Sequence, residues 1–342
     1  MKRHGNLFQR VASYDNLYCA YELARKGKRW QRDVKAFETD VEGHLLRLQE
    51  ALLTHAFHTS AYRTKKIYEP KERTIYILPF YPDRIVQHAL MNIVEPIWDG
   101  LMLADSYACR KGKGLHAGSR RTMGMVRRNA YCLKCDISKF YPSIDHDVMM
   151  RIIERKIKDK DVLWLFSDIL GSVPGGKNVP IGNYTSQWMG NLYLNQLDTY
   201  VKQVLGVRDY IRYCDDFLLF HDDKKQLGEW AEAVQHFCAE RLKLRLSKCD
   251  VFPTSHGVDF LGYRHFRGGY LLLRKSTAQR MKRRAKSIPY DLRHGRTTKE
   301  RALSSVVSMK GWLRWANTRH LALALHMDEL EAFVRGWEEA GA

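Results

Sequence analysis

Apolar and polar residues follow a helical period over the first 58 positions. Leucines and valines recur every three to four residues, and Asp40 is a candidate cap for the helix that follows it. Residues 62–68 and 74–80 are instead rich in strand formers and flank a polar turn. Pro82 suits the first turn of a further helix that runs through Ile97. The pattern therefore predicts a helical start, two extended arms and a helix.

The central and last parts of the chain combine short apolar strands with longer helices. Strands are expected at 131–137, 210–213, 217–220, 257–263 and 270–274. Helices are expected from Ser143 or Asp145, and at 161–170, 184–203, 224–241, 276–289, 298–316 and 319–338. A glycine-rich loop separates the second and third of these helices. This order of elements predicts an α+β fold whose strand patterns end near 264–275.

Positive charge is concentrated in two segments. The 342 residues include 57 Lys and Arg against 38 Asp and Glu, which gives a formal net charge of +19 at pH 7. Residues 106–135 contribute +8 and residues 264–301 contribute +11, so these two segments account for the whole excess. A generally soluble basic surface would spread this charge along the chain. Two localised basic faces instead suit a polyanion such as nucleic acid.

The sequence argues against a membrane-spanning or secreted protein. It has no run of about 18 apolar residues, and its N-terminus lacks the apolar stretch of a signal peptide. Seven scattered cysteines do not suggest a disulfide framework, which favours a reducing cytoplasm. Cys132 and Cys135 have a spacing found in zinc sites, but no second ligand pair follows, so both are expected in the core of a strand.

Three aspartates stand at the ends of predicted strands. Asp215 and Asp216 separate two apolar runs, where unpaired carboxylates would be costly to bury. Two aspartates in a turn usually only make the turn, as expected for Asp222 and Asp223, which are placed to end a strand and cap a helix. Asp136, however, closes another apolar strand. Three carboxylates on adjacent strands can hold two divalent cations, and Mg²⁺, or Mn²⁺ as a substitute, suits these oxygen ligands.

These aspartates lie in motifs that resemble those of reverse transcriptases. Residues 133–145 (LKCDISKFYPSID) are similar to the first palm motif of that family, and residues 212–217 (RYCDDF) to its Tyr-x-Asp-Asp hairpin. Between them, residues 179–187 (VPIGNYTSQ) resemble the loop and helix that contact nucleotide and template. Residues 257–263 (GVDFLGY) resemble the primer-grip region. The resemblance covers about residues 60–290.

The resemblance implies a right-hand polymerase with fingers, palm and thumb. Residues 1–263 would form the fingers and a palm with an antiparallel sheet, and residues 264–342 a basic helical thumb. The implied reaction is RNA-directed DNA synthesis by two-metal nucleotidyl transfer, with Asp136, Asp215 and Asp216 as catalytic metal ligands. Its substrates and partners would be template RNA, the cDNA/RNA heteroduplex and dNTPs.

The resemblance also assigns roles around these aspartates. Tyr141 would lie beneath the sugar and exclude a 2′-hydroxyl, with an ordinary core aromatic as the alternative. Gly182 would let the backbone approach a base closely. Lys248 is a candidate general acid for the departing pyrophosphate, with an exposed loop lysine as the alternative. The residues expected to contact the nucleotide are Lys71, Arg73, Tyr141, Ile181, Gly182 and Gln187.

Phosphate contacts are expected from the two basic segments. Residues 274–286 of the second segment lack the acidic partners, four residues away, that a solvated helix face usually has. Three later tryptophans, Trp312, Trp315 and Trp337, are expected in the thumb core. The residues expected to contact nucleic acid are Arg110, Lys111, Lys113, Arg274, Lys275, Arg280, Lys282, Arg283 and Arg284.

Residues 181–187 (IGNYTSQ) further resemble the diversity-generating retroelement enzymes of phages and bacteria. Many other reverse transcriptases have glutamine at the position of Ile181. That resemblance implies an error-prone enzyme with errors opposite template adenines, and a structured non-coding RNA and a small accessory protein or second subunit as further partners. Two alternatives stay open. One is a bacterial defence reverse transcriptase that copies a bound non-coding RNA, and the other is an inactive RNA-binding scaffold.

Overall fold

The computed structural model describes residues 2–68 and 72–338, and residue contacts divide the chain into two compact units. The first unit comprises residues 1–111, 134–217 and 229–249, and the second comprises residues 112–133, 218–228 and 250–342. Four elements are cut by this division: β3 (Tyr131–Ile137), β5 (Asp216–His221), α11 (Lys224–Leu242) and β6 (Leu246–Pro253). The predicted assignment of residues 1–263 to fingers and palm and 264–342 to a thumb stays a prediction.

The first unit begins with four helices. They are α1 (Phe8–Val11), α2 (Tyr14–Arg25), α3 (Arg32–Phe37) and α4 (Val41–Leu53). The carboxylate of Asp40 accepts a hydrogen bond from the Gly43 N–H at 2.9 Å, which confirms the predicted cap. After a helical turn at Phe80–Arg84, α5 (Ile85–Asp99) packs against α2 through a buried face that includes Ile85, Ala89 and Leu90.

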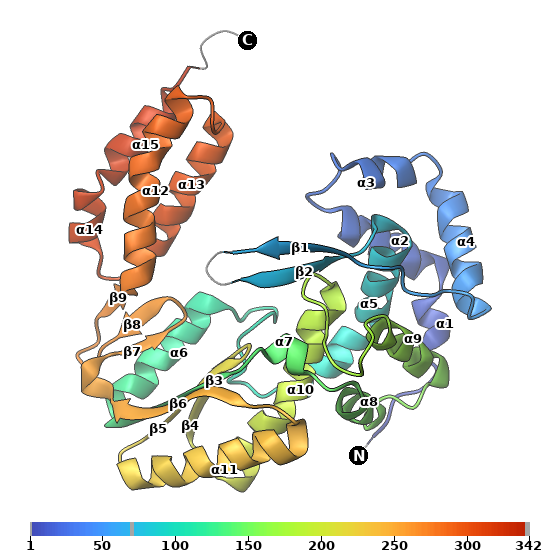
Figure 1. Cartoon of the computed structure of the whole chain (residues 1–342), viewed down its shortest axis with the longest axis horizontal. Helices are drawn as coiled ribbons and strands as arrows, with labels where there is room; N and C mark the ends of the chain where they lie inside the picture. Colours follow the sequence, from blue (N-terminus) through green and yellow to red (C-terminus); the bar gives the residue numbers. More distant parts are fainter. Residues whose placement is uncertain (1, 69–71, 339–342) are drawn as a thin grey trace. The chain divides into compact units, whose positions relative to one another are not determined.

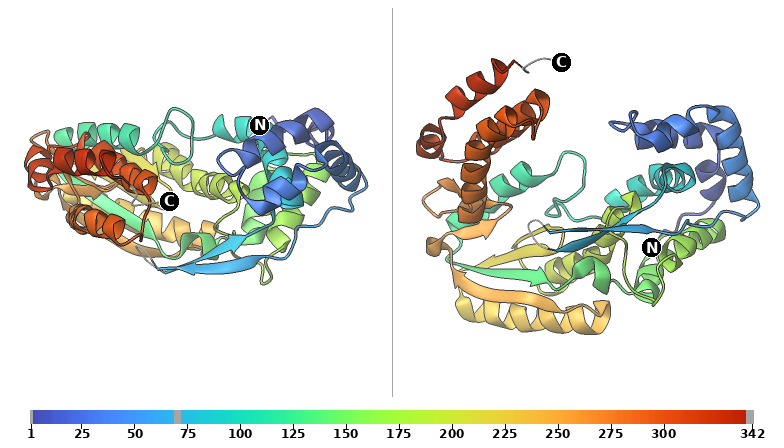
Figure 2. Two further views of the ribbon diagram at one scale, coloured as in Figure 1. Left: turned by 90° about the horizontal axis from the view of Figure 1, so that it is seen from above. Right: turned by 45° about the horizontal axis from the view of Figure 1, so that its top comes forward.

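The two predicted arms form an antiparallel ribbon. In β1 (Arg63–Ile67) and β2 (Arg73–Ile77), Arg63 lies opposite Ile77 and Ile67 lies opposite Arg73. The views in Figures 1 and 2 agree that the two strands run side by side over their whole length. Lys71, an expected nucleotide contact, lies outside the described residues.

The remaining helices of the first unit are α7 (Phe140–Ser143), α8 (His146–Glu154), α9 (Lys160–Gly171) and α10 (Tyr184–Thr199), which continues as a helical turn at Tyr200–Val204. Asp145 caps α8, because its carboxylate accepts from the Val148 N–H at 3.1 Å. Helix α10 is buried on almost every side, as expected for a helix through the middle of a core.

A four-stranded sheet has the order β4-β5-β3-β6, with β4 at Asp209–Tyr213. Strands β3, β4 and β5 confirm the predicted strand at 131–137 and the hairpin with Asp215 and Asp216 between its strands. Strand β6 was not predicted. It is an edge strand whose residues are half-buried or exposed, so its sequence (LSKCDVFP) lacks the apolar run that identified the other strands.

The second unit contains α6 (Leu115–Arg128) beside a small antiparallel sheet of β7 (Val258–Phe260), β8 (Tyr263–His265) and β9 (Leu271–Leu273). Helix α6 was not predicted, because its high charge and two glycines hide the apolar face that it buries. The strand expected at 257–263 is two strands. Leu261 and Gly262 form the turn between them with φ values of 56° and 81°.

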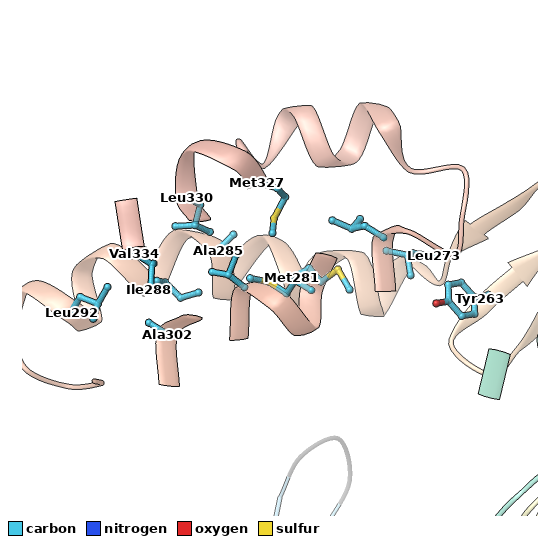
Figure 3. Close-up of a cluster of buried hydrophobic side chains, with 13 residues drawn as sticks. Tyr263, Leu273, Met281, Ala285, Ile288, Leu292, Ala302, Met327, Leu330 and Val334 are labelled. Carbon is cyan, nitrogen blue, oxygen red and sulfur yellow. The ribbon is translucent and has the colours of Figure 1, made fainter. Parts of the chain in front are cut away.

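Four helices complete the second unit: α12 (Lys275–Arg293), α13 (Lys299–Leu313), α14 (Arg319–Ala324) and α15 (Met327–Arg335). Helices α12, α13 and α15 pack on one another, as Figure 1 shows, and Figure 3 shows Met281, Ile288 and Val334 in the apolar cluster between them. The helix expected at 319–338 is interrupted, because His326 takes a left-handed conformation with φ of 47°. The mixture of helices and antiparallel strands confirms the predicted α+β class.

The three tryptophans expected in the thumb core divide into two groups. Trp312 and Trp337 pack against the apolar cluster, as predicted. Trp315 does not, because it stacks on His116 of α6 with ring centroids 4.2 Å apart and stays 40% exposed. It joins α13 to α6 within the second unit.

Candidate catalytic and nucleotide site

Asp215 and Asp216 occupy the tight turn between β4 and β5. Cys214 enters this turn in the left-handed region with φ of 53°, a conformation in which the chain reverses within two residues. Asp216 is the first residue of β5, and both carboxylates are half-buried. The turn therefore presents two acidic side chains at one end of the hairpin, as the sequence predicted.

Asp136 lies near the end of β3, the strand next to β5 in the sheet. Its Oδ2 accepts a hydrogen bond of 2.7 Å from the hydroxyl of Ser247 in β6. The ammonium of Lys134, two residues earlier on β3, lies 3.4 Å from Oδ2 of Asp216. The three predicted catalytic aspartates thus lie on neighbouring strands, and two of them contact a donor of the same sheet.

The donor types at this end of the sheet suit a hard divalent cation, because all three are carboxylates. Among the residues that the structure describes, no group of three or more His, Cys, Asp or Glu side chains is arranged to hold a metal ion. Asp136 contacts Ser247 and Asp216 contacts Lys134 in this arrangement.

A buried ion pair between β4 and α10 holds the hairpin in place. The guanidinium of Arg212 in β4 binds Asp198 of α10 through two hydrogen bonds of 2.7 and 2.6 Å, and both side chains are completely buried. Tyr210 donates to the same carboxylate at 2.5 Å. The remaining Arg212 donors reach the Asn191 side chain and the Cys214 carbonyl, each at 3.1 Å. Arg212 therefore fixes the residue that precedes Asp215.

Tyr141 lies next to this hairpin. Its ring packs on Gly190 of α10 so closely that a Cβ at that position would come within 3.2 Å of Cε1. Burial raises the pKa of Tyr141 far above its ordinary value, and the nearby Asp215 carboxylate raises it further. Phe140 is the buried core aromatic of the pair, whereas Tyr141 is half-buried and lines a cavity. This placement agrees with the expected sugar gate, whose role stays a prediction.

The cavity beside Tyr141 has a volume of about 470 Å³ and lies within the first unit. It brings together four of the predicted nucleotide contacts, Tyr141, Ile181, Gly182 and Gln187. Tyr184, from the same 179–187 segment, also lines it. Other lining residues lie far from this segment in the chain and were assigned no contact from the sequence, among them Lys28, Arg84, Gln87 and His88.

His88 and Tyr184 form one wall of this cavity. Their rings stack with centroids 4.3 Å apart and an interplanar angle of 13°. Burial, together with the neighbouring charges of Lys28 and Arg84, lowers the pKa of His88 to about 4. His88 is therefore neutral at pH 7, so this wall offers a flat aromatic surface with cations beside it.

The fold requires glycine at position 182, because there is no room for a side chain there, and the sequence did not reveal the reason. Its φ is 127°, and a Cβ would lie 2.3 Å from the carbonyl oxygen of Tyr76 in β2. The Tyr76 N–H also donates to the Ile181 carbonyl at 2.8 Å. The β1–β2 ribbon therefore already requires glycine at this position, and the predicted approach of a base stays a prediction. Arg73 is exposed at the start of β2.

Lys248 lies on strand β6 and is exposed. Its neighbour Ser247 reaches Asp136. The role of Lys248 as general acid stays a prediction.

Arg110 is held inside the first unit. Its guanidinium lies 2.6 Å from Asp99 and donates to the carbonyls of Leu103 and Ser106, and its side chain is only 9% exposed. The predicted phosphate contact is not supported, because these acceptors already occupy its donors. Lys111 is exposed and Lys113 is half-buried.

Helix α12 presents most of its predicted cations to solvent. Met281, Ala285 and Ile288 form its buried stripe, and Lys275, Arg280, Lys282 and Arg283 are exposed. Two other arginines are engaged within the second unit. Arg284 lies 2.8 Å from Asp291 and 3.4 Å from the Ser305 hydroxyl, and Arg274 lies 4.0 Å from Asp259. The structure thus separates a basic face from two arginines that hold the fold.

Residues 65–265, more than half of the chain, match the family described as reverse transcriptase (RNA-dependent DNA polymerase). Protein YkfC of Escherichia coli is 24% identical over 61% of this chain and 68% of its own length. The group II intron-encoded protein LtrA of Lactococcus lactis is 24% identical over 54% of this chain and 43% of its own. The nuclear intron maturase 1 of Arabidopsis thaliana is 27% identical over 32% of this chain and 14% of its own.

The match has limits that follow from length. The matched part of this chain spans less than half of the length of these two intron-related proteins. Within the described ranges, no helix is long and apolar enough to cross a membrane.

Proposed function

This chain belongs to the reverse transcriptase family, and from that premise we propose that it makes cDNA on an RNA template by Mg²⁺-dependent nucleotidyl transfer. RNA-directed DNA polymerisation is the activity of the family. The observation that carries the proposal is the placement of Asp136, Asp215 and Asp216 on neighbouring strands within the segment that matches the family. Template RNA, the cDNA/RNA heteroduplex and dNTPs are the partners that this reaction needs.

Asp136, Asp215 and Asp216 would hold two Mg²⁺ ions, with Mn²⁺ as a substitute. Bound metal supplies activation of the primer 3′-hydroxyl and neutralises charge on the phosphates. Until then, three clustered carboxylates repel one another, and the contacts with Ser247 and Lys134 offset part of that repulsion. Arg212 holds the Cys214 carbonyl, so the backbone before Asp215 is already positioned.

The cavity of about 470 Å³ would receive the nucleotide and the template base opposite it. Tyr141 would stand against the sugar and exclude a 2′-hydroxyl, because Gly190 supports its ring from behind. Arg73 and Lys71 would bind the triphosphate. The exposed cations of α12 would bind phosphates of the template and product strands.

Within the family, the nucleotide pocket favours an error-prone enzyme of the diversity-generating kind. The side chain of Ile181 lines the pocket and has no hydrogen-bonding group, and its carbonyl already accepts from the Tyr76 N–H. At this position the pocket would therefore recognise the nascent base pair by its shape alone. Such an enzyme would act in a bacterial cytoplasm with a structured non-coding RNA and a small accessory protein.

A primer-extension assay with a defined RNA template, dNTPs and Mg²⁺ tests this proposal. We expect extension that requires both RNA and metal and stops when a chelator is added. Deep sequencing of the cDNA should show errors concentrated opposite template adenines. Absence of extension would favour an inactive RNA-binding scaffold. Faithful copying of adenine, together with one non-coding RNA that copurifies, would favour a defence enzyme.

A further inference from the structure

Two cysteine side chains meet directly beside the catalytic hairpin. Cys214 is the turn residue that precedes Asp215, and Cys109 belongs to the loop that precedes α6. Their thiols share a hydrogen bond. Neither cysteine has a role in the proposed polymerase chemistry.

The backbone around these thiols is held on both sides. The Arg212 N–H donates to the Asp105 carbonyl at 2.9 Å, and the Tyr107 N–H donates to the Arg212 carbonyl at 3.0 Å. The Asn191 side chain adds a bond of 2.8 Å to the Ala108 carbonyl. The loop that carries Cys109 is therefore paired with the end of β4, so the contact between the thiols follows from the fold.

The two thiols also differ in access to solvent. Cys109 is exposed and Cys214 is half-buried, whereas Cys132, Cys135 and Cys238 are buried in the core. A small oxidant in solution can thus reach Cys109, and the second thiol lies next to it. This combination of an accessible thiol and an adjacent one is typical of a site that forms a reversible disulfide.

We propose that Cys109 and Cys214 form a peroxide-sensitive thiol pair that switches the polymerase off. The Cys109 sulfur attacks one oxygen of hydrogen peroxide, the O–O bond breaks, and a sulfenic acid and one water result. The Cys214 sulfur then attacks the sulfur of that sulfenic acid. The S–S bond forms, the S–O bond breaks and a second water leaves. Overall, two thiols are oxidised to a disulfide and one peroxide is reduced to two waters.

The effect on activity rests on the proposed function. A disulfide needs its sulfurs about 2.05 Å apart, which is closer than two thiols in hydrogen-bond contact. At least one of the two thiols must therefore shift, and any shift of Cys214 moves the peptide that carries Asp215. Because displacements of about 1 Å at a reacting centre cost up to about a hundredfold in rate, we expect oxidation to lower extension at least tenfold.

The experiment must distinguish this cysteine pair from a second pair that could also form a disulfide. Cys135 of β3 and Cys249 of β6 have sulfurs 3.6 Å apart and could be linked in the same way. Cys249→Ser removes that pair. Cys19 is an exposed cysteine on α2, so Cys19→Ser is the matched control for loss of one accessible thiol. Cys109→Ser removes the proposed switch.

The experiment treats the full chain with hydrogen peroxide, maps the disulfides by mass spectrometry and measures primer extension before and after reduction with dithiothreitol. We expect a Cys109–Cys214 link and a reversible loss of extension in the parent, Cys19→Ser and Cys249→Ser. Cys109→Ser should keep its extension after peroxide treatment. A peptide map without this link, or inactivation of Cys109→Ser equal to that of the parent, would overturn the proposal.

The map of the parent protein needs no variant, so a Cys109→Ser chain that fails to fold does not remove the test. A link that forms without loss of extension would refute the switch. If the reduced chain does not extend a primer at all, the proposed function fails, and the peptide map still decides whether the thiol pair exists.

Discussion

Arg212 in the catalytic hairpin and Arg283 in α12 are the same residue type in opposite surroundings. Arg212 has no exposed surface, and its guanidinium is bound to Asp198 at 2.6 Å. Arg283 is exposed on a helix whose acidic residue, Asp291, is already paired with Arg284. A buried guanidinium depends on an internal acceptor, whereas an exposed one can serve a partner outside the chain. Basic residues are therefore candidates for RNA binding only where the fold supplies no acceptor.

The aspartates of the first unit divide in the same way. Asp198 is completely buried and takes hydrogen bonds from both Arg212 and Tyr210. Asp136 and Asp216 are half-buried, and a metal could replace their contacts with Ser247 and Lys134. The comparison separates charges that hold the fold from charges that remain for chemistry. The first three predictions below test that division.

Asp198→Asn should have the largest effect on stability. It leaves the Arg212 guanidinium buried without a counter-charge, which costs about 3–5 kcal/mol of unfolding free energy. Urea unfolding measures this loss. Asp99→Asn is the matched control, because Asp99 pairs with Arg110 but is 45% exposed and should cost about 1 kcal/mol or less. Similar losses in the two variants would break the distinction between them.

Asp215→Asn should show the reverse behaviour. Removing one carboxylate of the catalytic turn should lower Mg²⁺-dependent extension by about a hundredfold or more, since charge stabilisation at the reacting phosphate is lost. Its melting temperature should be unchanged or higher, because one source of repulsion among the aspartates is removed. Primer extension and thermal unfolding of the same sample measure both effects. Extension above a few per cent of the parent would rule out the catalytic role.

The exposed cations of α12 should control salt dependence. Replacing Arg280, Lys282 and Arg283 with glutamine should make the slope of log K against log salt for RNA binding less steep by about 2 to 3, since each lost phosphate contact releases about one counterion fewer. Arg284→Gln is the matched control on the same helix. It should reduce stability through Asp291 and Ser305 while leaving the salt slope unchanged. Equal slopes for the parent and the triple variant would identify α12 as a solvated surface.

Tyr141→Ala should relax the choice of sugar. The ring is supported by Gly190, so its removal opens space where a 2′-hydroxyl would otherwise clash. We expect incorporation of ribonucleotides relative to deoxyribonucleotides to rise roughly tenfold or more. Tyr141→Phe keeps the ring and serves as the control. If Tyr141→Ala keeps the parental ratio, the side chain is a core aromatic only.

Local patterns were enough to predict the elements that carry the aspartates. The apolar runs around Asp136, Asp215 and Asp216 predicted β3 and the β4–β5 hairpin. The cap at Asp40 and a helix start at Ser143 or Asp145 also followed from short-range sequence. These features depend on neighbours within a few residues, which is why the sequence reveals them.

Features that depend on distant partners could not be predicted. The acceptors of Arg110 lie up to 11 residues away, and the stacked pair of His88 and Tyr184 joins two helices that are remote in the chain. Strand β6 has too little apolar sequence to be recognised alone, and the close approach of Tyr76 to Gly182 exists only once the β1–β2 ribbon is folded. The sequence therefore identifies the reacting groups better than the pocket around them.

Ile181→Gln should have the smallest effect and tests how the pocket reads a base. The parent side chain lines the cavity without a hydrogen-bonding group, and glutamine would add one. One hydrogen bond in a dry site contributes roughly 0.5–1.5 kcal/mol, so the error rate opposite template adenine should fall by up to about tenfold. Deep sequencing of cDNA from one defined RNA measures this change, and Ile181→Leu controls for packing because it keeps an aliphatic side chain of similar volume. Extension on templates without adenine should be the same in all three proteins. Equal error spectra for Ile181→Gln and the parent would show that fidelity is set by other residues of the cavity, with the stacked wall of His88 and Tyr184 as the next to test.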